Sequence, residues 1–286
     1  MAAAEKTTRN GAFSMFRRRA VRGFPGLLAL YVLLALCTAL ALYAALYPEA
    51  NGTVVFGNDQ LTIDASHTDQ GYVMVQHTQT EQMLKLSITK GEDAFTYDLK
   101  ANGEYVNFPL TLGDGQYTLQ VFQRVSGNRY TREASYNIIV KIVDENLPYL
   151  YPNQYVWYTP ESEAVAIAAQ LCEGLDTDWE ILSAVRAYVV DNITYDYMLA
   201  QTVKSGYLPS VDDVLDKGKG ICFDYSALTA CMLRSQGVPT QLVIGYADQR
   251  YHAWNNVLVN GQWLLVDTTS EANAIKVTSY TKERIN

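Results

Sequence analysis

Three residue types that can together perform acyl transfer follow one another along the chain: Cys222, His252 and Asp267. A thiolate attacks a carbonyl carbon, an imidazole moves the proton, and a carboxylate holds the imidazole in its working orientation. Each residue alone has a plainer interpretation, because a cysteine or histidine on an apolar element more often belongs to the core. Three plain interpretations would have to hold at once, so we predict a catalytic Cys-His-Asp site.

The residues around Cys222 predict that its thiol lies at the start of a helix. Gly218 and Gly220 allow a sharp backbone turn just before the cysteine, and residues 227–235 have a helical pattern that a glycine and a proline then close. The unpaired N–H groups and the positive dipole end of a helix N-terminus favour the thiolate. The same N–H groups can stabilise an oxyanion.

A hairpin is predicted to bring His252 and Asp267 together. Asn260-Gly261 separates two strand-like stretches, and Asn-Gly between apolar runs is a strong hairpin signal. With these two residues as the loop, Val259 pairs with Gln262. The same register places His252 and Asp267 as diagonal neighbours on one face of the hairpin, within reach of each other.

A metal site is not supported, because the sequence has no C-x-x-C spacing and its three histidines are scattered. We therefore expect neither a metal nor a cofactor. His67 and His77 are interpreted as surface or edge residues without a chemical role. Cys172 and Cys231 leave two alternatives open, a disulfide or two buried free thiols, and the second is favoured.

Charge is distributed unevenly along the chain. The formal net charge is -8, but the first 47 residues hold six Lys or Arg residues and one acid. The remainder therefore has 16 basic and 29 acidic residues, a net charge of -13. Such a surface repels nucleic acid at long range, so no nucleic-acid partner is expected.

The N-terminal region has the pattern of a membrane anchor. Residues 1–26 are predicted as a basic cytoplasmic N-terminus, and residues 27–47, which carry no charge, as a transmembrane signal-anchor helix. A cleaved signal peptide and a lipoprotein anchor at Cys37 are the alternatives. All three place the rest of the chain outside the cytoplasm. We expect a single-pass cell-membrane protein with an extracytoplasmic catalytic domain.

Two domains are predicted beyond the anchor. Residues 51–144 alternate about seven short apolar stretches with Gly-, Asp- and Asn-rich turns, which is typical of a β-sandwich of the immunoglobulin-like kind. A Pro- and Tyr-rich linker opens the second domain, residues 145–286. There a helix is expected from Thr159-Pro160 to about Cys172, and Thr177 to Glu180 forms a capping box for the next one. The fold class is therefore α+β.

The order Cys, His, Asp, with the nucleophile on a helix and its partners on a hairpin, resembles the transglutaminase-like superfamily. The resemblance covers roughly residues 145–270. It implies a papain-like core with Cys222 as nucleophile, His252 as general base and acid, and Asp267 as the group that orients the imidazole. The stretches that carry it are GKGICFDYSAL (218–228), GVPTQLVIGY (237–246), HAWNNVLVNGQWLLVDTT (252–269) and, more weakly, NITYDY (192–197).

Together these features predict an extracytoplasmic enzyme that performs thiol-dependent acyl transfer. Hydrolysis is favoured, by a cysteine protease or amidase acting on peptide, cell-wall or surface-protein amides, because water as acceptor needs no second binding site. The alternatives are a protein cross-linking transglutaminase and a non-catalytic cell-surface binding module. The β-sandwich is a candidate for contacting a cell-wall or surface-protein partner, and the compact layout behind one span favours a bacterial source.

Overall fold

The computed structural model describes residues 47–78 and 80–286. The predicted basic N-terminus, residues 1–26, and all but the last residue of the predicted anchor, 27–47, lie outside this part of the chain. Within the described ranges, no helix is both long and apolar enough to cross a membrane. The anchor therefore stays a prediction from the sequence.

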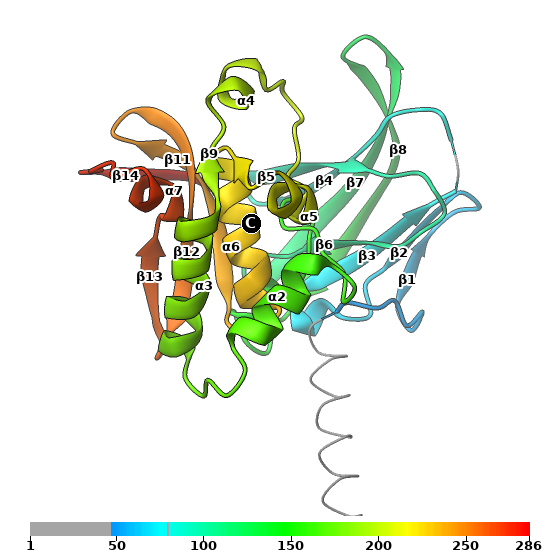
Figure 1. Ribbon diagram of the computed structural model, residues 1–286. Coiled ribbons are helices and arrows are strands. Elements are labelled where there is room, and N and C mark those ends of the chain that lie inside the picture. Colours follow the sequence, from blue (N-terminus) through cyan, green and yellow to red (C-terminus); the bar gives the residue numbers. More distant parts are fainter. Residues whose placement is uncertain (1–46, 79) are drawn as a thin grey trace, which may run out of the picture. The chain divides into compact units, whose positions relative to one another are not determined.

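Two antiparallel four-stranded sheets form the first half of the described chain (Figure 1). Apolar side chains from both sheets, among them Leu61, Val73, Leu86 and Leu119, are buried in one shared core, so the two sheets form a sandwich. Its immunoglobulin-like relationship stays a prediction. In spatial order, the first sheet consists of β1 (Val55–Gly57), β2 (Leu61–Asp64), β3 (Tyr72–His77) and β6 (Val106–Pro109). The second sheet consists of β5 (Asp93–Leu99), β4 (Leu84–Lys90), β7 (Gly115–Ser126) and β8 (Arg129–Val140).

Two features of the sandwich differ from the sequence prediction. The four-residue strand β2 was not among the predicted strands. The interpretation of His77 as a surface or edge residue is wrong, because it is only 2% exposed and its strand β3 pairs with β2 on one side and β6 on the other. Its Nε2 contacts Glu133 Oε1 at 3.2 Å, so the buried imidazole has a polar partner.

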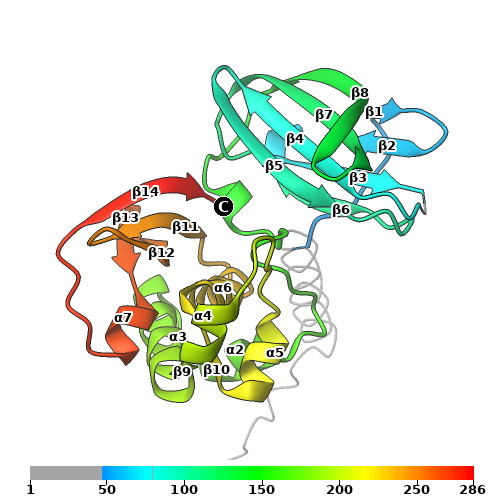
Figure 2. The same ribbon diagram turned by 90° about the horizontal axis from the view of Figure 1, so that it is seen from above.

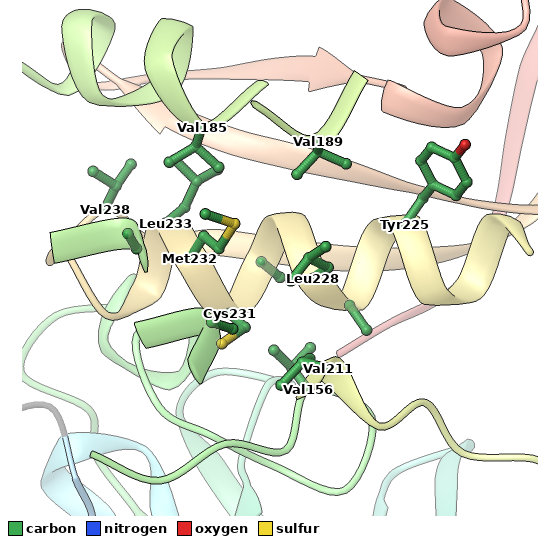
Figure 3. Packing of buried hydrophobic residues seen from close by; sticks show 14 of the residues in the cluster. Val156, Val185, Val189, Val211, Tyr225, Leu228, Cys231, Met232, Leu233 and Val238 are labelled. Carbon is green, nitrogen blue, oxygen red and sulfur yellow. The ribbon is translucent and has the colours of Figure 1, made fainter. Parts of the chain in front are cut away.

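Helix α6 (Cys222–Arg234) is the centre of the second half of the chain. Every residue from Asp224 to Arg234 is buried. Figure 2 shows α6 between the sheet β13-β12-β11-β14 and the helices α2 (Glu163–Leu171), α3 (Asp178–Asn192) and α5 (Val211–Lys217). Figure 3 shows Leu228 and Met232 of α6 packed near Val185 and Val189 of α3. This apolar packing fixes the helix that carries Cys222.

Local signals explain where these helices begin and end. The capping box of α3 is confirmed, with Glu180 N–H donating to Thr177 Oγ1 at 3.3 Å and Thr177 N–H donating to Glu180 Oε2 at 3.2 Å. Helix α5 ends at Gly218, whose φ of 60° is left-handed. Helix α2 begins at Glu163, later than predicted, because residues 159–162 form a turn ahead of it.

The sheet beside α6 consists of β11 (Thr240–Ala247), β12 (Arg250–Val259), β13 (Gln262–Val266) and β14 (Tyr280–Ile285). Strand β14 was not predicted. The four short elements of this half of the chain are β9 (Thr194–Tyr195), α4 (Tyr197–Thr202), β10 (Lys219–Gly220) and α7 (Thr268–Ala272). Two 3-10 turns, η1 (Thr68–Gln70) and η2 (Leu147–Tyr149), lie earlier in the chain. The predicted combination of helices and sheets is confirmed.

Fully buried Arg234, at the end of α6, joins three separate segments. Its guanidinium donates to the carbonyl oxygens of Thr240 at 2.8 Å, Tyr151 at 2.7 Å and Asn286 at 2.9 Å. These carbonyls belong to β11, to the linker that follows the sandwich, and to the residue after β14. Burial lowers the pKa of Arg234 to about 10, so it stays charged at neutral pH. The contacts hold the end of α6 against the sheet that carries His252.

Candidate active site

Cys222 is the first residue of α6, as the sequence predicts, and Asp224 shapes the turn before it. Asp224 Oδ2 accepts from Ile221 N–H at 2.8 Å, and Oδ1 accepts from the Tyr207 hydroxyl at 2.6 Å. A Cβ on Gly220 would lie 2.5 Å from the Cβ of Asp224, so this close approach requires glycine. The first N–H groups of a helix lack a carbonyl partner within it, so the start of α6 offers oxyanion donors beside the thiol.

His252 and Asp267 are in contact, with His252 Nε2 2.9 Å from Asp267 Oδ2. The predicted hairpin register is confirmed from Val259↔Gln262 to Asn255↔Val266. Beyond that point the ladder stops, because Asp267 leaves the strand and becomes the N-cap of α7. Its Oδ1 accepts from Ser270 N–H at 2.9 Å. The predicted contact therefore forms, but a helix cap and not a strand pair holds the carboxylate.

The electrostatics of this group favour a protonated imidazole. Burial lowers the pKa of His252, but its hydrogen bonds with Asp267 and Cys222 and the charges of those partners outweigh burial and raise the pKa to about 9. Burial raises the pKa of Asp267, but its hydrogen bond and charge interaction with His252 bring it below the usual value. Because Nε2 faces Asp267, Nδ1 is the ring nitrogen available to the thiol.

Tyr280 is a member of the site that the sequence analysis missed. Its hydroxyl donates to Asp267 Oδ2 at 2.8 Å, the same oxygen that contacts His252. The ring of Tyr280 also packs on Trp254, with centroids 5.0 Å apart. Trp254 is itself buried, so this contact is part of the packing beside the site. Tyr280 lies on β14, so its role depends on a strand without a clear sequence signal.

Asn255 connects the helix of the thiol to the strand of the imidazole. It lies on β12, three residues after His252, and is fully buried. Its Nδ2 donates to Ser226 O of α6 at 3.0 Å and to Gln241 O of β11 at 3.3 Å. A buried amide with such bonds fixes its neighbours, because breaking them leaves polar groups without water. The spacing between α6 and β12 is therefore set by polar contacts as well as by the core.

Two cavities adjoin the thiol, with volumes of about 340 Å³ and about 480 Å³. Cys222, His252 and Tyr251 line both of them. We call the first the α4-side cavity, because Tyr197 and Ala200 of α4 line it. The second is called the sandwich-side cavity, because Lys85 of β4 and Thr96 and Asp98 of β5 line it. The side chains of Cys222 and His252 therefore border both cavities.

The remaining cysteines and histidines are not gathered into a metal site. Among residues 47–78 and 80–286, no cluster of three or more His, Cys, Asp or Glu side chains could hold a metal ion. Cys172 and Cys231 are free and buried, which is the alternative that the sequence analysis favoured. Burial raises the pKa of both thiols, which makes them poor nucleophiles.

Comparison with known proteins relates the part of the chain that carries Cys222, His252 and Asp267 to a known superfamily. Residues 165–268 match the model of the transglutaminase-like superfamily. This part of the chain is therefore a transglutaminase-like core, and the resemblance expected from the motifs is confirmed.

Human and mouse kyphoscoliosis peptidase are similar to part of the chain. The human protein is 31% identical over 124 residues, which cover 39% of this chain and 18% of that protein. The mouse protein is 28% identical over 134 residues, covering 42% and 20%. The matching segment thus spans about a fifth of these relatives. Red sea bream transglutaminase, a solved structure, aligns at 12% identity with a TM-score of 0.31, covering 69% of this chain and 48% of that one.

Proposed function

We propose that the chain is a thiol-dependent acyl-transfer enzyme that hydrolyses peptide or protein amides. The observation that carries this proposal is the position of His252, whose Nε2 lies 2.9 Å from Asp267 Oδ2 and whose ring lines the same two cavities as Cys222. A packing role explains a buried histidine, but it does not require a thiol at a helix N-terminus and an oriented carboxylate around the same ring.

In the first half of the proposed reaction, Cys222 Sγ attacks the amide carbonyl carbon and forms a C–S bond. The charge that develops on the carbonyl oxygen meets the free N–H groups at the start of α6. His252, protonated up to about pH 9, gives its proton to the leaving nitrogen as the C–N bond breaks. The products are a thioester on Cys222 and a free amine.

In the second half, water replaces the thiol. His252, now neutral, accepts a proton from water as the oxygen attacks the thioester carbon. The C–S bond breaks, and the carboxylic acid leaves with the oxygen of water. Asp267 stays ionised throughout and holds the ring, since its carboxylate is fixed by Ser270 and Tyr280. Hydrolysis is preferred over cross-linking because water needs no binding site of its own.

The proposal includes a location and a partner class. The basic segment 1–26 and the uncharged segment 27–47 support a single-pass anchor, with the described part of the chain outside the cytoplasm. Peptide, cell-wall or surface-protein amides are then the accessible substrates. Attachment of the tag-free chain to membranes after alkaline carbonate washing supports the anchor, and its release by that wash would contradict it.

One assay separates hydrolysis from cross-linking. Unfolded casein is incubated with the full-length chain and with Cys222→Ser, with and without dansylcadaverine as a primary amine. New peptide termini that depend on Cys222 support hydrolysis. Dansyl incorporation without cleavage would overturn hydrolysis in favour of a transglutaminase. Neither product, together with a Cys222 thiol that alkylates no faster than an ordinary one, would favour the non-catalytic binding module.

A further inference from the structure

The α4-side and sandwich-side cavities meet at the reactive groups. Cys222, His252 and Tyr251 line both, so a ligand that crosses from one cavity to the other passes over the thiol. Tyr251 is 67% exposed and Tyr197, which lines the α4-side cavity, is 66% exposed. Exposed aromatic side chains beside a cavity supply apolar contact area at low entropic cost. These features suit an elongated ligand.

The β-sandwich supplies one wall of this path. Thr96 and Asp98 of β5 and Lys85 of β4 line the sandwich-side cavity together with Cys222. The wall is fixed to the linker, because Asp98 N–H donates to Gln154 Oε1 at 3.0 Å and Gln154 Nε2 donates to Asp98 O at 2.5 Å. Two hydrogen bonds therefore hold this wall of the cavity to the linker that follows the sandwich.

Arg284 of β14 makes a second connection to the wall. Its guanidinium carbon lies 4.9 Å and 5.0 Å from the ring centroids of Phe95 and Tyr97 on β5, and 4.5 Å from that of Tyr155. Such cation–π contacts are favourable and strengthen as water is excluded. Arg284 lines the sandwich-side cavity, and its buried Nη2 has no hydrogen-bond partner in the described part of the chain. A donor is thus unused at this wall.

The charge of the cavities is opposite to that of the chain around them. Lys85, Lys204 and Arg284 line the sandwich-side cavity with one acid, Asp98, which pairs with Lys85. Arg250 lines the α4-side cavity, where no acid is found among the lining residues. The chain beyond residue 47 has 16 basic and 29 acidic residues, so an excess of cations here is unusual. A concave cationic surface attracts anionic groups.

We infer that the substrate is an extended polypeptide segment that occupies both cavities and places acidic side chains in the sandwich-side cavity, near Lys204. This inference rests on the proposed function, because it assumes that an amide is held over Cys222. It gives the β-sandwich a part in selecting the substrate. Thr96, exposed on β5, is the position where the wall can be altered with least effect on the core.

Two matched peptide probes test the inference with the full-length chain. Each carries a chloroacetamide on a central side chain, flanked by glutamates in one probe and by lysines in the other. Cys222 Sγ displaces chloride and forms a C–S bond, and peptide mapping measures the labelling rate. We expect the glutamate probe to react at least about fivefold faster, since one favourable charge contact in water is worth about 1 kcal/mol and the lysine probe makes an unfavourable one in its place.

Four variants locate the effect. Lys204→Glu and Thr96→Glu each place an acid in the sandwich-side cavity and are expected to lower the glutamate-to-lysine rate ratio at least about fivefold. Lys141→Glu and Thr131→Glu make the same changes at exposed positions that line neither cavity, and should leave the ratio unchanged. A wild-type ratio near one, or equal changes in all four variants, would overturn the inference.

Iodoacetamide labelling, measured in parallel, separates the two proposals. Fast labelling of Cys222 that depends on His252, together with a peptide ratio near one, would remove the substrate assignment and leave the proposed function in place. Slow labelling that is indifferent to His252→Gln would contradict the proposed function itself.

Discussion

Replacing Asp267 by asparagine should lower the pKa of His252 from about 9 toward its ordinary value of 6.5. Asparagine keeps the shape of the side chain and an oxygen that can cap α7, so the change removes mainly the negative charge. Burial of the ring lowers the pKa of His252, and without the negative charge of Asp267 less remains to offset this effect, so the neutral imidazole is favoured. A rise from 6.5 to about 9 corresponds to about 3 kcal/mol in favour of the protonated form, at roughly 1.36 kcal/mol per pKa unit.

The measurement is an NMR titration of the imidazole protons. The chain has three histidines, so the spectrum holds few signals, and His67→Gln and His77→Gln assign the other two. The wild type should show one imidazole that titrates near pH 9, and in Asp267→Asn this transition should move down toward pH 6.5. An imidazole of His252 that titrates near 6.5 in the wild type, or is unchanged by Asp267→Asn, would refute the reasoning.

The same pair makes stability depend on pH in a defined direction. The folded pKa of His252 lies above its unfolded value, so its contribution to stability is complete below about pH 6.5 and is lost as the pH rises through 9. The folded pKa of Asp267 lies below its usual value, so its contribution is present above about pH 4 and is lost on further acidification. The unfolding free energy of the wild type relative to His252→Gln should therefore fall by about 3 kcal/mol between pH 6.5 and pH 10.

Three further substitutions test the supports of the site, each by urea unfolding. Tyr280→Phe removes one hydrogen bond to a charged carboxylate and should lower the unfolding free energy by about 1.5–3 kcal/mol; no change would show that water replaces the hydroxyl. Arg284→Met keeps most of the apolar volume but removes the cation from its three aromatic rings, and should lower the unfolding free energy by about 2 kcal/mol. An unchanged unfolding free energy would show that Arg284 does not stabilise the contact between β14 and the sandwich. Gly220→Ala places a Cβ against Asp224, and should lower the unfolding free energy by about 1–3 kcal/mol. It should also slow the alkylation of Cys222. An unfolding free energy equal to that of the wild type would show that the turn accommodates the Cβ without strain.

The hairpin was predictable because its loop residues have few alternatives. Asn260 and Gly261 adopt φ values of 51° and 76°, in the left-handed region that asparagine and glycine tolerate best. That loop fixes the register, and the register fixes which side chains share a face. The contact between His252 and Asp267 follows from it.

Strand β14 was not predictable, because tertiary contacts define it. Three of its residues Tyr280–Ile285 are exposed and three are half-buried, without the alternation of a half-buried strand. The strand forms by pairing with β11, where a Cβ on Gly245 would lie 2.1 Å from Thr281 O. The sequence contains Gly245 but does not reveal which strand approaches it. Tyr280 and Arg284 were therefore missed along with the strand.

The path across the thiol could not be read from the sequence for a similar reason. Thr96 and Cys222 are far apart along the chain and line one cavity only because the linker and β14 bind the sandwich. The burial of His77 was also missed. A histidine at the end of an apolar run gives no sign of whether its strand lies inside a sheet, and β3 has partners on both sides.

The central claim is that Cys222 is an activated nucleophile, and its alkylation by iodoacetamide tests this most directly. Peptide mapping of the full-length chain follows Cys222, with buried Cys172 and Cys231 as controls for an intact fold. We predict that Cys222 reacts rapidly at neutral pH and below, and that His252→Gln abolishes this reactivity while the two buried thiols stay protected. Slow labelling of Cys222 that rises with pH as for an ordinary thiol, and is the same in His252→Gln and Asp267→Asn, would contradict the account.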